Sequence, residues 1–501
     1  MAHFVFVLLF LLLAPAIVLV LLLRNRRQSL RLPPGPKPWP VIGNLLQIGP
    51  MPHATFARLA QTHGPLISLR IGTQLLVVGS SPDAATAILK THDHHLSGRS
   101  VPHVSFARDP DLNRDSIAWS THCSDQWRSL RSLVRTELFS TKVVAEDGRQ
   151  SMIREDKAHD MTSFLSKNRG EEVRIRELVF KFTFNALANV YMSADLIGDE
   201  WAPSRVVRDM MELHGALNIS DLYPALGFLD LQGLRKRTAE CVSKLRELWD
   251  PIVFRRRESA RGRNNSSGSI SSTSDFLDVL LDSGFSDKQI SYTFVELLAA
   301  VSDTTSATME WAMSELIANP KTLTACRQEL DDKFPKGHTV KESDLAQLPY
   351  LRACVKETLR LHPPAPLLLP RRAAKDCHVM GYTVPKDAQV LVNVWAVARD
   401  PRYWEEPLRF KPERFVEGGS ESDVDYKGNH FEYLPFGSGR RICSGLPMAM
   451  RKVQLAVATL VHGFEWSLPA GMVAEDLDMD EKYGVTLMKL NPLVLIPTPR
   501  D

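Results

Sequence analysis

The stretch PFGSGRRICSG, from Pro435 to Gly445, places one cysteine, Cys443, among three glycines and next to two consecutive arginines. A cysteine sulfur stays anionic near neutral pH only when a metal, positive charge or backbone N–H groups stabilise it. Glycines let the backbone turn tightly around the sulfur. Phe436 can lie against a flat ligand, and Arg441 can reach an anionic group on it. The pattern indicates a thiolate that binds haem iron; a glycine-rich loop around an inert buried cysteine is the alternative.

The same loop fits the pattern F-x-x-G-x-R-x-C-x-G through Phe436, Gly439, Arg441, Cys443 and Gly445. A match at five fixed positions is rare by chance, and the chain resembles the cytochrome P450 family over nearly its whole length. The resemblance implies a mainly α fold with a minor β-sheet region, a long central helix and a Cys-ligated haem b. It makes Cys443 the metal ligand and assigns Phe436, Gly439 and Arg441 to haem binding.

Two more motifs of that family precede the cysteine loop in the expected order. Glu357 and Arg360 match its ExxR helix, and Arg414 lies in the PERF segment Pro412–Phe415. A charged pair three residues apart is usually only a solvated helix face. Because the cysteine loop follows, we expect instead a buried network of the three charges, since buried charges persist only when they are paired.

Four residues are candidates for binding the haem propionates. Trp127 and Arg131 match the W-x-x-x-R helix of the family and share one helix face. Arg371 and Arg441 complete the set implied by the resemblance. An ordinary surface arginine is the alternative for each of the three cations.

A long helix is predicted from a capping box, formed by Ser286 and Gln289, to Asn319. Midway along it lie Asp303 and Thr304, the acid and alcohol to which the resemblance assigns proton delivery during oxygen activation. Thr304 can also bond back to a carbonyl one turn earlier and open the helix locally. The alternative is a Ser/Thr pair that is merely tolerated on a buried helix.

The family usually has glycine where this chain has Val301. A β-branched side chain narrows the neighbouring groove and resists distortion of the helix. Val301 either trims the pocket and alters where the substrate is attacked, or marks an enzyme that catalyses a rearrangement or dehydration. Because Asp303 and Thr304 are retained, the first interpretation is favoured.

The substrate pocket is expected to be apolar and to be built from the regions that contact substrate in the family. Its expected lining comprises Leu297, Leu298, Val301, Leu367, Leu368, Leu369, Val485, Thr486 and Leu487. For any one of these residues, a place in the ordinary core is equally consistent. Segments such as HPPAPLLLPR resemble plant microsomal members, in particular geraniol hydroxylase and the diterpene hydroxylases. A terpenoid is therefore the expected substrate, with a phenolic or alkaloid compound as the alternative.

The predicted activity is that of an O2-dependent monooxygenase acting on a hydrophobic plant specialised metabolite. The chain has neither a Walker loop nor a flavin-type GxGxxG motif, so electrons must come from outside it. The resemblance implies that they come from NADPH through NADPH-cytochrome P450 reductase. A basic face would dock that partner by electrostatic steering; its expected residues are Arg128, Arg135, Arg440, Arg451 and Lys452. A haem-thiolate isomerase or dehydratase, and a non-catalytic haem-binding membrane protein, are the alternatives.

Residues 4–23 carry no charge and, as a helix, would span about 30 Å of hydrocarbon. Arginines follow this run rather than precede it, which favours an uncleaved anchor over a signal peptide. We therefore predict a transmembrane anchor at 1–23, a basic and Pro-rich hinge at 24–44 and a haem-thiolate catalytic domain at 45–501. The expected location is the endoplasmic reticulum membrane, crossed once, with the catalytic domain in the cytosol.

Composition excludes other classes of protein. A net charge of +3 over 501 residues argues against nucleic acid as a partner. The six cysteines are scattered and form no CxxC pair, which argues against a zinc site or a disulfide framework. The apolar tips of residues 221–237 either dip into a bilayer or form an interhelical turn.

Overall fold

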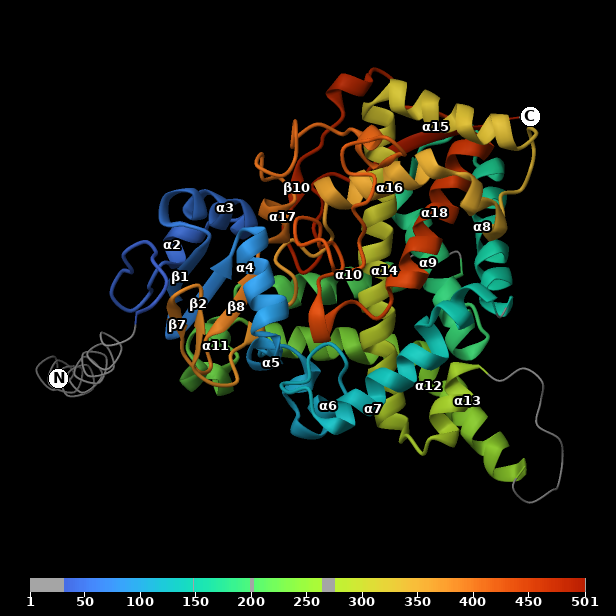
Figure 1. Cartoon of the computed structure of the whole chain (residues 1–501). Helices are drawn as coiled ribbons and strands as arrows, with labels where there is room; N and C mark the ends of the chain where they lie inside the picture. Colours follow the sequence, from blue (N-terminus) through green and yellow to red (C-terminus); the bar gives the residue numbers. More distant parts are fainter. Residues whose placement is uncertain (1–30, 147, 199–201, 264–274, 501) are drawn as a thin grey trace, which may run out of the picture.

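The computed structural model describes residues 31–146, 148–198, 202–263 and 275–500, and the predicted class, mainly α with a minor β-sheet region, is confirmed. Figure 1 shows the helices packed together, with the largest sheet on the side where the described chain begins. The predicted anchor at 1–23 and residues 24–30 of the predicted hinge lie outside the described residues. Within the described ranges, no helix has the length and apolar character needed to cross a membrane.

One helix runs through the middle of the molecule (Figure 1). Helix α14 (Asp287–Ala318) begins at the predicted capping box: the Ser286 Oγ accepts the N–H of Gln289, and the Gln289 Oε1 accepts the N–H of Ser286 at 2.9 Å. The helix ends at Ala318 with Asn319 as its C-cap, within one residue of the predicted end. Its main helical neighbours are α9 (Ile175–Met192), α12 (Leu234–Arg263), α16 (Pro349–Leu361) and α18 (Leu446–Gly463). Most side chains of α14 are therefore buried.

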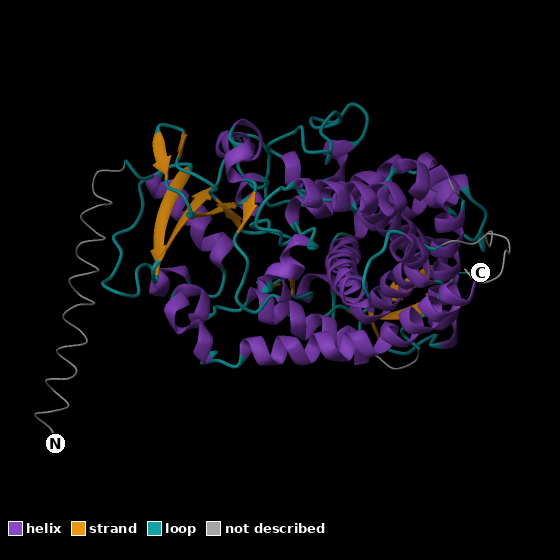
Figure 2. Ribbon diagram, turned by 90° about the horizontal axis from the view of Figure 1, so that it is seen from below, coloured by secondary structure: helices purple, strands orange, loops and turns teal. Residues whose placement is uncertain are grey.

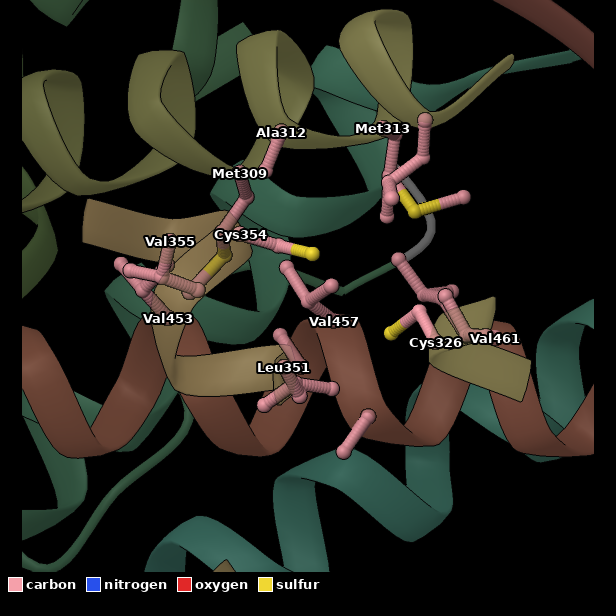
Figure 3. Close-up of a cluster of buried hydrophobic side chains, with 14 of the residues drawn as sticks. Met309, Ala312, Met313, Cys326, Leu351, Cys354, Val355, Val453, Val457 and Val461 are labelled. Carbon is pink, nitrogen blue, oxygen red and sulfur yellow. The ribbon is translucent and has the colours of Figure 1, made fainter. Parts of the chain in front are cut away.

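Apolar side chains fill the space where α14, α16 and α18 meet (Figure 3). The cluster includes Met309 and Met313 of α14, Leu351 of α16, Val457 of α18 and Cys326 of α15 (Pro320–Lys333). Burial of such side chains stabilises the fold by about 25 cal/mol for each Å² removed from water. The cluster holds α16 and α18 in place on α14, and these helices carry the ExxR pair and the residues next to Cys443.

A five-stranded sheet lies at one end of the molecule (Figure 2). In spatial order its strands are β1 (Leu66–Ile71), β2 (Gln74–Gly79), β8 (Gln389–Val392), β5 (Arg371–Arg372) and β3 (Gly98–Arg99). The first two form an antiparallel hairpin that turns at Gly72-Thr73. β8 is parallel to β2, and β3 pairs with β5 so that Arg99 lies opposite Arg371.

Shorter elements complete the fold. The α-helices not yet described are α2 (Leu45–Ile48), α3 (Pro52–His63), α4 (Pro82–Thr86), α5 (Asp93–Leu96), α6 (Pro110–Arg114), α7 (Asp125–Val134), α8 (Arg149–Lys167), α10 (Ala202–Gly215), α11 (Ile219–Leu222), α13 (Phe276–Asp282) and α17 (Val394–Val397). The other strands are β4 (Val173–Arg174), β6 (Cys377–Val379), β7 (Tyr382–Val384), β9 (Phe464–Ser467), β10 (Glu481–Lys482), β11 (Met488–Lys489) and β12 (Val494–Pro499). Residues 32–44 contain an isolated bridge between Trp39 and Gly43 and no helix, as expected for a Pro-rich segment.

Candidate active site

An internal cavity of about 290 Å³ lies between α14, α10 and the loop that contains Cys443. The predicted site residues that line it are Cys443, Phe436, Arg441, Arg131, Arg371, Thr304, Leu297, Val301, Leu368, Leu369 and Val485. Those that do not line it are Gly439, Trp127, Asp303, Leu298, Leu367, Thr486 and Leu487. The lining thus combines a cysteine, several arginines and mostly apolar side chains.

The cysteine loop is closed by its own backbone. The Cys443 N–H donates to the Phe436 carbonyl at 3.0 Å, and Gly437 has a φ of +68°, which other residues rarely adopt. The Cys443 side chain is accessible inside the cavity, while the surrounding protein buries it from bulk solvent. A sulfur in this position can reach a ligand held in the cavity.

Two effects act on the sulfur in opposite directions. Burial raises the pKa of the Cys443 thiol above its usual value. The N–H groups of Gly445 and Leu446 and the charge of Arg131 act to lower that pKa. Backbone donors and a neighbouring cation are the environment that a thiolate ligand requires.

Gly439 does not line the cavity, contrary to the prediction. A Cβ at this position would come within 2.3 Å of the Leu89 carbonyl oxygen, and the φ of Gly439 is +72°. The next residue, Arg440, donates its N–H to Asp93 Oδ2 at 3.0 Å. Glycine is therefore needed so that the loop can pack closely on the segment leading into α5.

Arg441 is buried beside the cavity and makes several contacts with the backbone. Its Nη1 donates to the Ile117 carbonyl at 3.0 Å, and its guanidinium lies 4.3 Å from the centre of the Trp127 ring. Burial lowers the pKa of Arg441 to about 10, and the charges of Arg371 and Arg131 act in the same direction. The guanidiniums at this wall therefore repel one another.

Strand pairing brings a fourth cation to the same wall. Arg99 lines the cavity beside Arg371, and its Nη1 donates to the Leu369 carbonyl at 2.8 Å. Burial, followed by the charges of Arg441 and Arg371, lowers the pKa of Arg99 well below its usual value. The sequence gives no motif around Arg99, so only the register of β3 against β5 reveals it.

Trp127 lies behind the cavity wall, so it does not contact the cavity as predicted. Its Nε1 donates to the Ile117 carbonyl at 3.0 Å. The ring lies under the guanidiniums of Arg441 and Arg131, at 4.3 and 5.3 Å from its centre. Arg131 also donates to the Ile442 carbonyl in the cysteine loop. Trp127 thus positions two arginines, and its role in binding a propionate stays a prediction.

The charge balance of this wall fits an anionic cofactor. Of Arg99, Arg131, Arg371 and Arg441, Arg371 alone forms an ion pair with a described carboxylate, at 2.9 Å from Asp93. Buried cations without carboxylates are costly unless a ligand supplies negative charge. Haem carries two propionates, and its iron accepts a thiolate, so the donor set fits haem.

The three charges of the predicted network lie together and are almost fully buried. Arg360 forms two hydrogen bonds with Glu357, at 2.7 and 2.8 Å, and Arg414 Nε donates to Glu357 Oε1 at 3.1 Å. Remaining N–H groups of the two arginines donate to backbone carbonyls, among them Ala398 and Glu405. This network is satisfied without any ligand.

The acid and the alcohol of α14 face different surroundings. The Thr304 Oγ1 lines the cavity and donates to the Ala300 carbonyl at 2.7 Å, but α14 continues without a break, so the predicted local opening is absent from this helix. Asp303 is buried away from the cavity, and its Oδ2 has no partner among the described residues. Burial raises the pKa of Asp303, partly offset by the nearby Thr486 hydroxyl and Arg176 charge.

Val301 lies near Gly445, at the end of the cysteine loop. A Cβ built on Gly445 would lie 4.0 Å from both the Val301 Cγ2 and the Cys443 Sγ. Val301 also lines the cavity. Its side chain therefore occupies space close to the sulfur, where a glycine would leave that space open.

Four predicted pocket residues belong to the packed core instead. Leu298 is one residue past Leu297, which turns it by about 100° around α14 into a buried cluster. Leu367 is buried against the sheet, in the cluster that contains Ile67. Thr486 and Leu487 are also buried outside the cavity, because the Leu487 N–H donates to the Pro364 carbonyl at 2.8 Å and ties this segment to the core.

Sequence reasoning also missed polar residues of the cavity. Glu296 lines the cavity and accepts the N–H of Ala118, and burial raises its pKa. A lone carboxylate within the apolar run of α14 was an available signal. His214 of α10 lines the cavity as well, and no local pattern distinguishes it from an ordinary surface histidine.

The predicted basic face loses one member. Lys452 is fully buried, its Nζ donates to the Thr183 carbonyl at 3.3 Å, and burial lowers its pKa well below the usual value. Arg128, Arg135 and Arg440 are exposed, and Arg451 is partly exposed. Lys452 is one position along α18 from Arg451, and this step turns its side chain into the core.

Comparison with known proteins identifies similar chains over nearly the full length. The family model described as Cytochrome P450 matches residues 33–496. The probable (S)-N-methylcoclaurine 3′-hydroxylase isozyme 2 of Coptis japonica is 48% identical, over 93% of this chain and 93% of its own length. The (S)-N-methylcoclaurine 3′-hydroxylase isozyme 1 of Papaver somniferum is 46% identical, over 94% and 95%.

A third relative has a different named substrate. The flavonoid 3′-monooxygenase of Petunia hybrida is 41% identical, over 95% of this chain and 93% of its own length. None of these three relatives is named as a geraniol or diterpene hydroxylase. They correct the resemblance to that group and favour the alternative, a phenolic or alkaloid substrate.

Proposed function

The chain belongs to the cytochrome P450 family, and we propose that this monooxygenase of plant specialised metabolism hydroxylates the aromatic ring of an alkaloid or phenolic compound. The names of the relatives support this substrate class rather than the expected terpenoid, and two different substrates share a 3′ position in those names. The observation that carries the proposal is the cavity itself: Phe106, Trp119 and Phe139 line it together with Cys443. Aromatic side chains pack favourably on aromatic ligands.

We propose that the residues of this site hold haem b. When bound, haem supplies the activation of O2 and the insertion of one oxygen atom into a C–H bond. Cys443 would bind the haem iron through its sulfur, and the N–H groups of Gly445 and Leu446 would stabilise the charge on that sulfur. Arg99, Arg131, Arg371 and Arg441 would hold the propionates. The isomerase or dehydratase alternative is not retained, because the three relatives reported above are named as hydroxylases or as a monooxygenase.

Thr304 is proposed to pass protons within the cavity. Because its hydroxyl donates to Ala300, the Thr304 oxygen keeps lone pairs that can accept a hydrogen bond on the cavity side. Asp303, whose pKa is raised by burial, holds a proton more readily than an exposed aspartate does. We expect Thr304→Ala to raise hydrogen peroxide released per substrate oxidised severalfold. Ser302→Ala, on the same helix but outside the cavity, is the control, and equal coupling in both variants would remove Thr304 from proton transfer.

Val301 is proposed to set the position of attack. Its Cγ2 narrows the space next to Cys443, so Val301→Gly should change the ratio of hydroxylated products while the haem content stays the same. Glycine inside a helix costs about 1 kcal/mol, which a single variant can absorb. Val301→Ala should give an intermediate product ratio. An unchanged product ratio in the glycine variant contradicts this role.

Electrons are proposed to come from NADPH through a reductase that docks on Arg128, Arg135, Arg440 and Arg451. Exposed cations steer an acidic partner, and salt screens that attraction. The rate of reduction should therefore fall as ionic strength rises. Charge reversal at Arg135 should slow reduction, whereas Lys452→Met, which alters a buried residue, should leave the docking rate unchanged. A rate that is insensitive to salt contradicts electrostatic docking.

Membrane association is also proposed, on the endoplasmic reticulum with the catalytic domain in the cytosol. Phe228 is 81% exposed, and Leu229 and Leu231 are exposed beside it in the segment after α11. Trp39 and Val41 are exposed as well, and the Tyr223 hydroxyl donates to the Val41 carbonyl at 3.1 Å, which joins the two segments. Exposed apolar side chains on one joined surface suit contact with lipid.

The substrate proposal is tested by reconstitution. Purified protein is combined with NADPH-cytochrome P450 reductase and offered N-methylcoclaurine, a flavonoid and geraniol separately. Ring hydroxylation of either aromatic compound, dependent on NADPH, is the expected result. Turnover of geraniol without turnover of the aromatic compounds would overturn the proposed substrate class.

A further inference from the structure

The carboxyl end of α10 contributes a polar group to an otherwise apolar part of the cavity. Met210, Met211 and His214 of this helix line the cavity. The His214 Nδ1 lies 2.8 Å from the Met210 carbonyl oxygen, one turn earlier. A carbonyl oxygen has no proton to give, so Nδ1 must carry the hydrogen and donate it. His214 is thereby held in one tautomer.

In that tautomer the other ring nitrogen is a hydrogen-bond acceptor. The His214 Nε2 makes no hydrogen bond with any described residue, and it is not among the fully enclosed unpaired atoms of the structure. Burial lowers the pKa of His214, and no charged side chain contributes to that shift. The ring is therefore neutral at physiological pH, and Nε2 keeps its lone pair.

A ring contact and the packing of the neighbouring backbone fix the position of His214. The Trp119 ring, from the segment before α7, lies 6.2 Å from it at an angle of 29°. The neighbouring Gly215 packs so closely on the turn before β11 that a Cβ there would come within 2.9 Å of the Val485 backbone nitrogen. Trp119 and Val485 both line the cavity. An acceptor that is fixed in this way discriminates between ligands better than a mobile one.

We propose that His214 is a specificity-determining residue whose Nε2 accepts a hydrogen bond from a phenolic hydroxyl of the bound aromatic substrate. The inference rests on the proposed function and names the feature by which the cavity selects its substrate. A fixed acceptor in a mostly apolar cavity favours a ligand that has an apolar body and places a donor at that position. A ligand that lacks the donor loses this bond and leaves Nε2 unpaired.

The test compares two probes that differ only in the donor, 4-butylphenol and 4-butylanisole. Their dissociation constants for the haem-loaded protein are measured from the change in Soret absorption on titration, without turnover. His214→Phe keeps a ring but removes the acceptor, and it should reduce the preference for the phenol over the ether by about threefold to tenfold. His214→Gln keeps an acceptor and should retain at least part of the preference.

Met211→Leu is the matched control, because it changes the same helix and the same cavity without removing a hydrogen-bonding group. It should alter the two affinities equally. The inference is overturned if the parent prefers the phenol over the ether no more strongly than His214→Phe does. It is also overturned if His214→Phe and His214→Gln show the same preference. If His214→Phe does not fold, His214→Leu gives the same comparison.

Failure of this inference and failure of the proposed function are distinguishable. Binding of the probes requires no reaction, so a preference that depends on His214 can persist in a protein that does not hydroxylate aromatic rings. Conversely, ring hydroxylation with a preference that is unaffected in His214→Phe would overturn only the role of His214.

Discussion

Two groups of buried charge in this protein have opposite charge balance. In the first, Glu357 pairs with Arg360 and Arg414, and backbone carbonyls satisfy most of the remaining donors. In the second, the four arginines at the cavity share one described carboxylate, Asp93. The first group therefore needs nothing from outside the chain, whereas the second lacks negative charge.

The difference separates a structural network from a binding site. Apart from the half-buried Arg131, the side chains of both groups are nearly inaccessible to solvent, so burial alone does not distinguish the two groups. A carboxylate that is paired and hydrogen-bonded within the chain is evidence for a role in folding. Clustered guanidiniums whose pKa values are lowered, next to a cavity that holds a cysteine, are evidence for an anionic ligand.

Removal of the carboxylate at the centre of the first group should have the largest effect. Glu357→Gln leaves Arg360 and Arg414 buried without an opposite charge, and we expect a loss of about 3–5 kcal/mol of stability. Chemical denaturation measures this loss, with the exposed Glu417→Gln as control. A stable Glu357→Gln protein would show that the network does not hold the fold together.

Loss of one cation from the second group should affect the cofactor more than the fold. Arg441→Leu removes a charge that is repelled by Arg371 and Arg131, so the haem-free protein should keep its stability. Haem affinity should fall by about 10- to 100-fold, since a charge-assisted hydrogen bond contributes about 1.5–3 kcal/mol. Transfer of haem to a scavenger protein measures the affinity, and the exposed neighbour variant Arg440→Leu is the control. A large loss of stability in the haem-free Arg441→Leu protein would contradict the distinction between the structural network and the binding site.

A third carboxylate, that of Glu481, extends the comparison to the pH dependence of stability. Burial opposes the charge of Glu481, but hydrogen bonds from His362 and His53 and the charge of Arg399 lower its pKa below the usual value. A lowered folded-state pKa adds stability above the unfolded-state pKa, about 4.3, and this stability is lost as the pH falls toward the folded-state pKa.

Glu481→Gln should therefore cost about 1–2 kcal/mol near pH 7, and the difference from the parent should shrink below about pH 4. Denaturation curves at several pH values measure it, with the exposed Glu475→Gln as reference. A difference that does not depend on pH would show that the charge of Glu481 is unimportant.

The smallest expected effect is a gain in stability rather than a loss. Lys452 is a buried cation that lies away from the cavity, and burial lowers its pKa well below the usual value. Lys452→Met keeps the volume and removes the buried ammonium, and should stabilise the protein by about 1 kcal/mol at pH 7. Because the lowered pKa makes the parent more stable as pH rises, this gain should diminish toward pH 10. Destabilisation by Lys452→Met would show that the hydrogen bond from Lys452 to the Thr183 carbonyl outweighs the cost of burying the charge.

Local patterns in the sequence predicted the elements whose signals are local. The capping box at Ser286 and Gln289 marks the start of α14, because a cap depends on neighbouring residues. The family motifs indicated which charges meet in the first group. Neighbouring residues on a helix were assigned less well. Leu298, next to Leu297, and Lys452, next to Arg451, were expected at the pocket and at the basic face, but both side chains point into the core.

The remaining parts of the site depend on contacts between distant segments. Arg99 reaches the cavity through the pairing of β3 with β5, and His214 reaches it through the packing of Gly215 on the Val485 turn. Neither contact leaves a pattern in a single sequence. Gly439 and Trp127 were assigned to the site by their motifs but act from behind it, since motifs mark residues that shape a site as well as those that line it.

The central claim is that the sulfur of Cys443 binds haem iron within the arginine-lined cavity. The absorption difference spectrum of the reduced protein with carbon monoxide tests this claim most directly, on the parent and on Cys443→Ser. We predict a strongly red-shifted Soret band in the parent and its loss in the variant. A variant that is folded, contains haem and retains the same red-shifted band would contradict the claim.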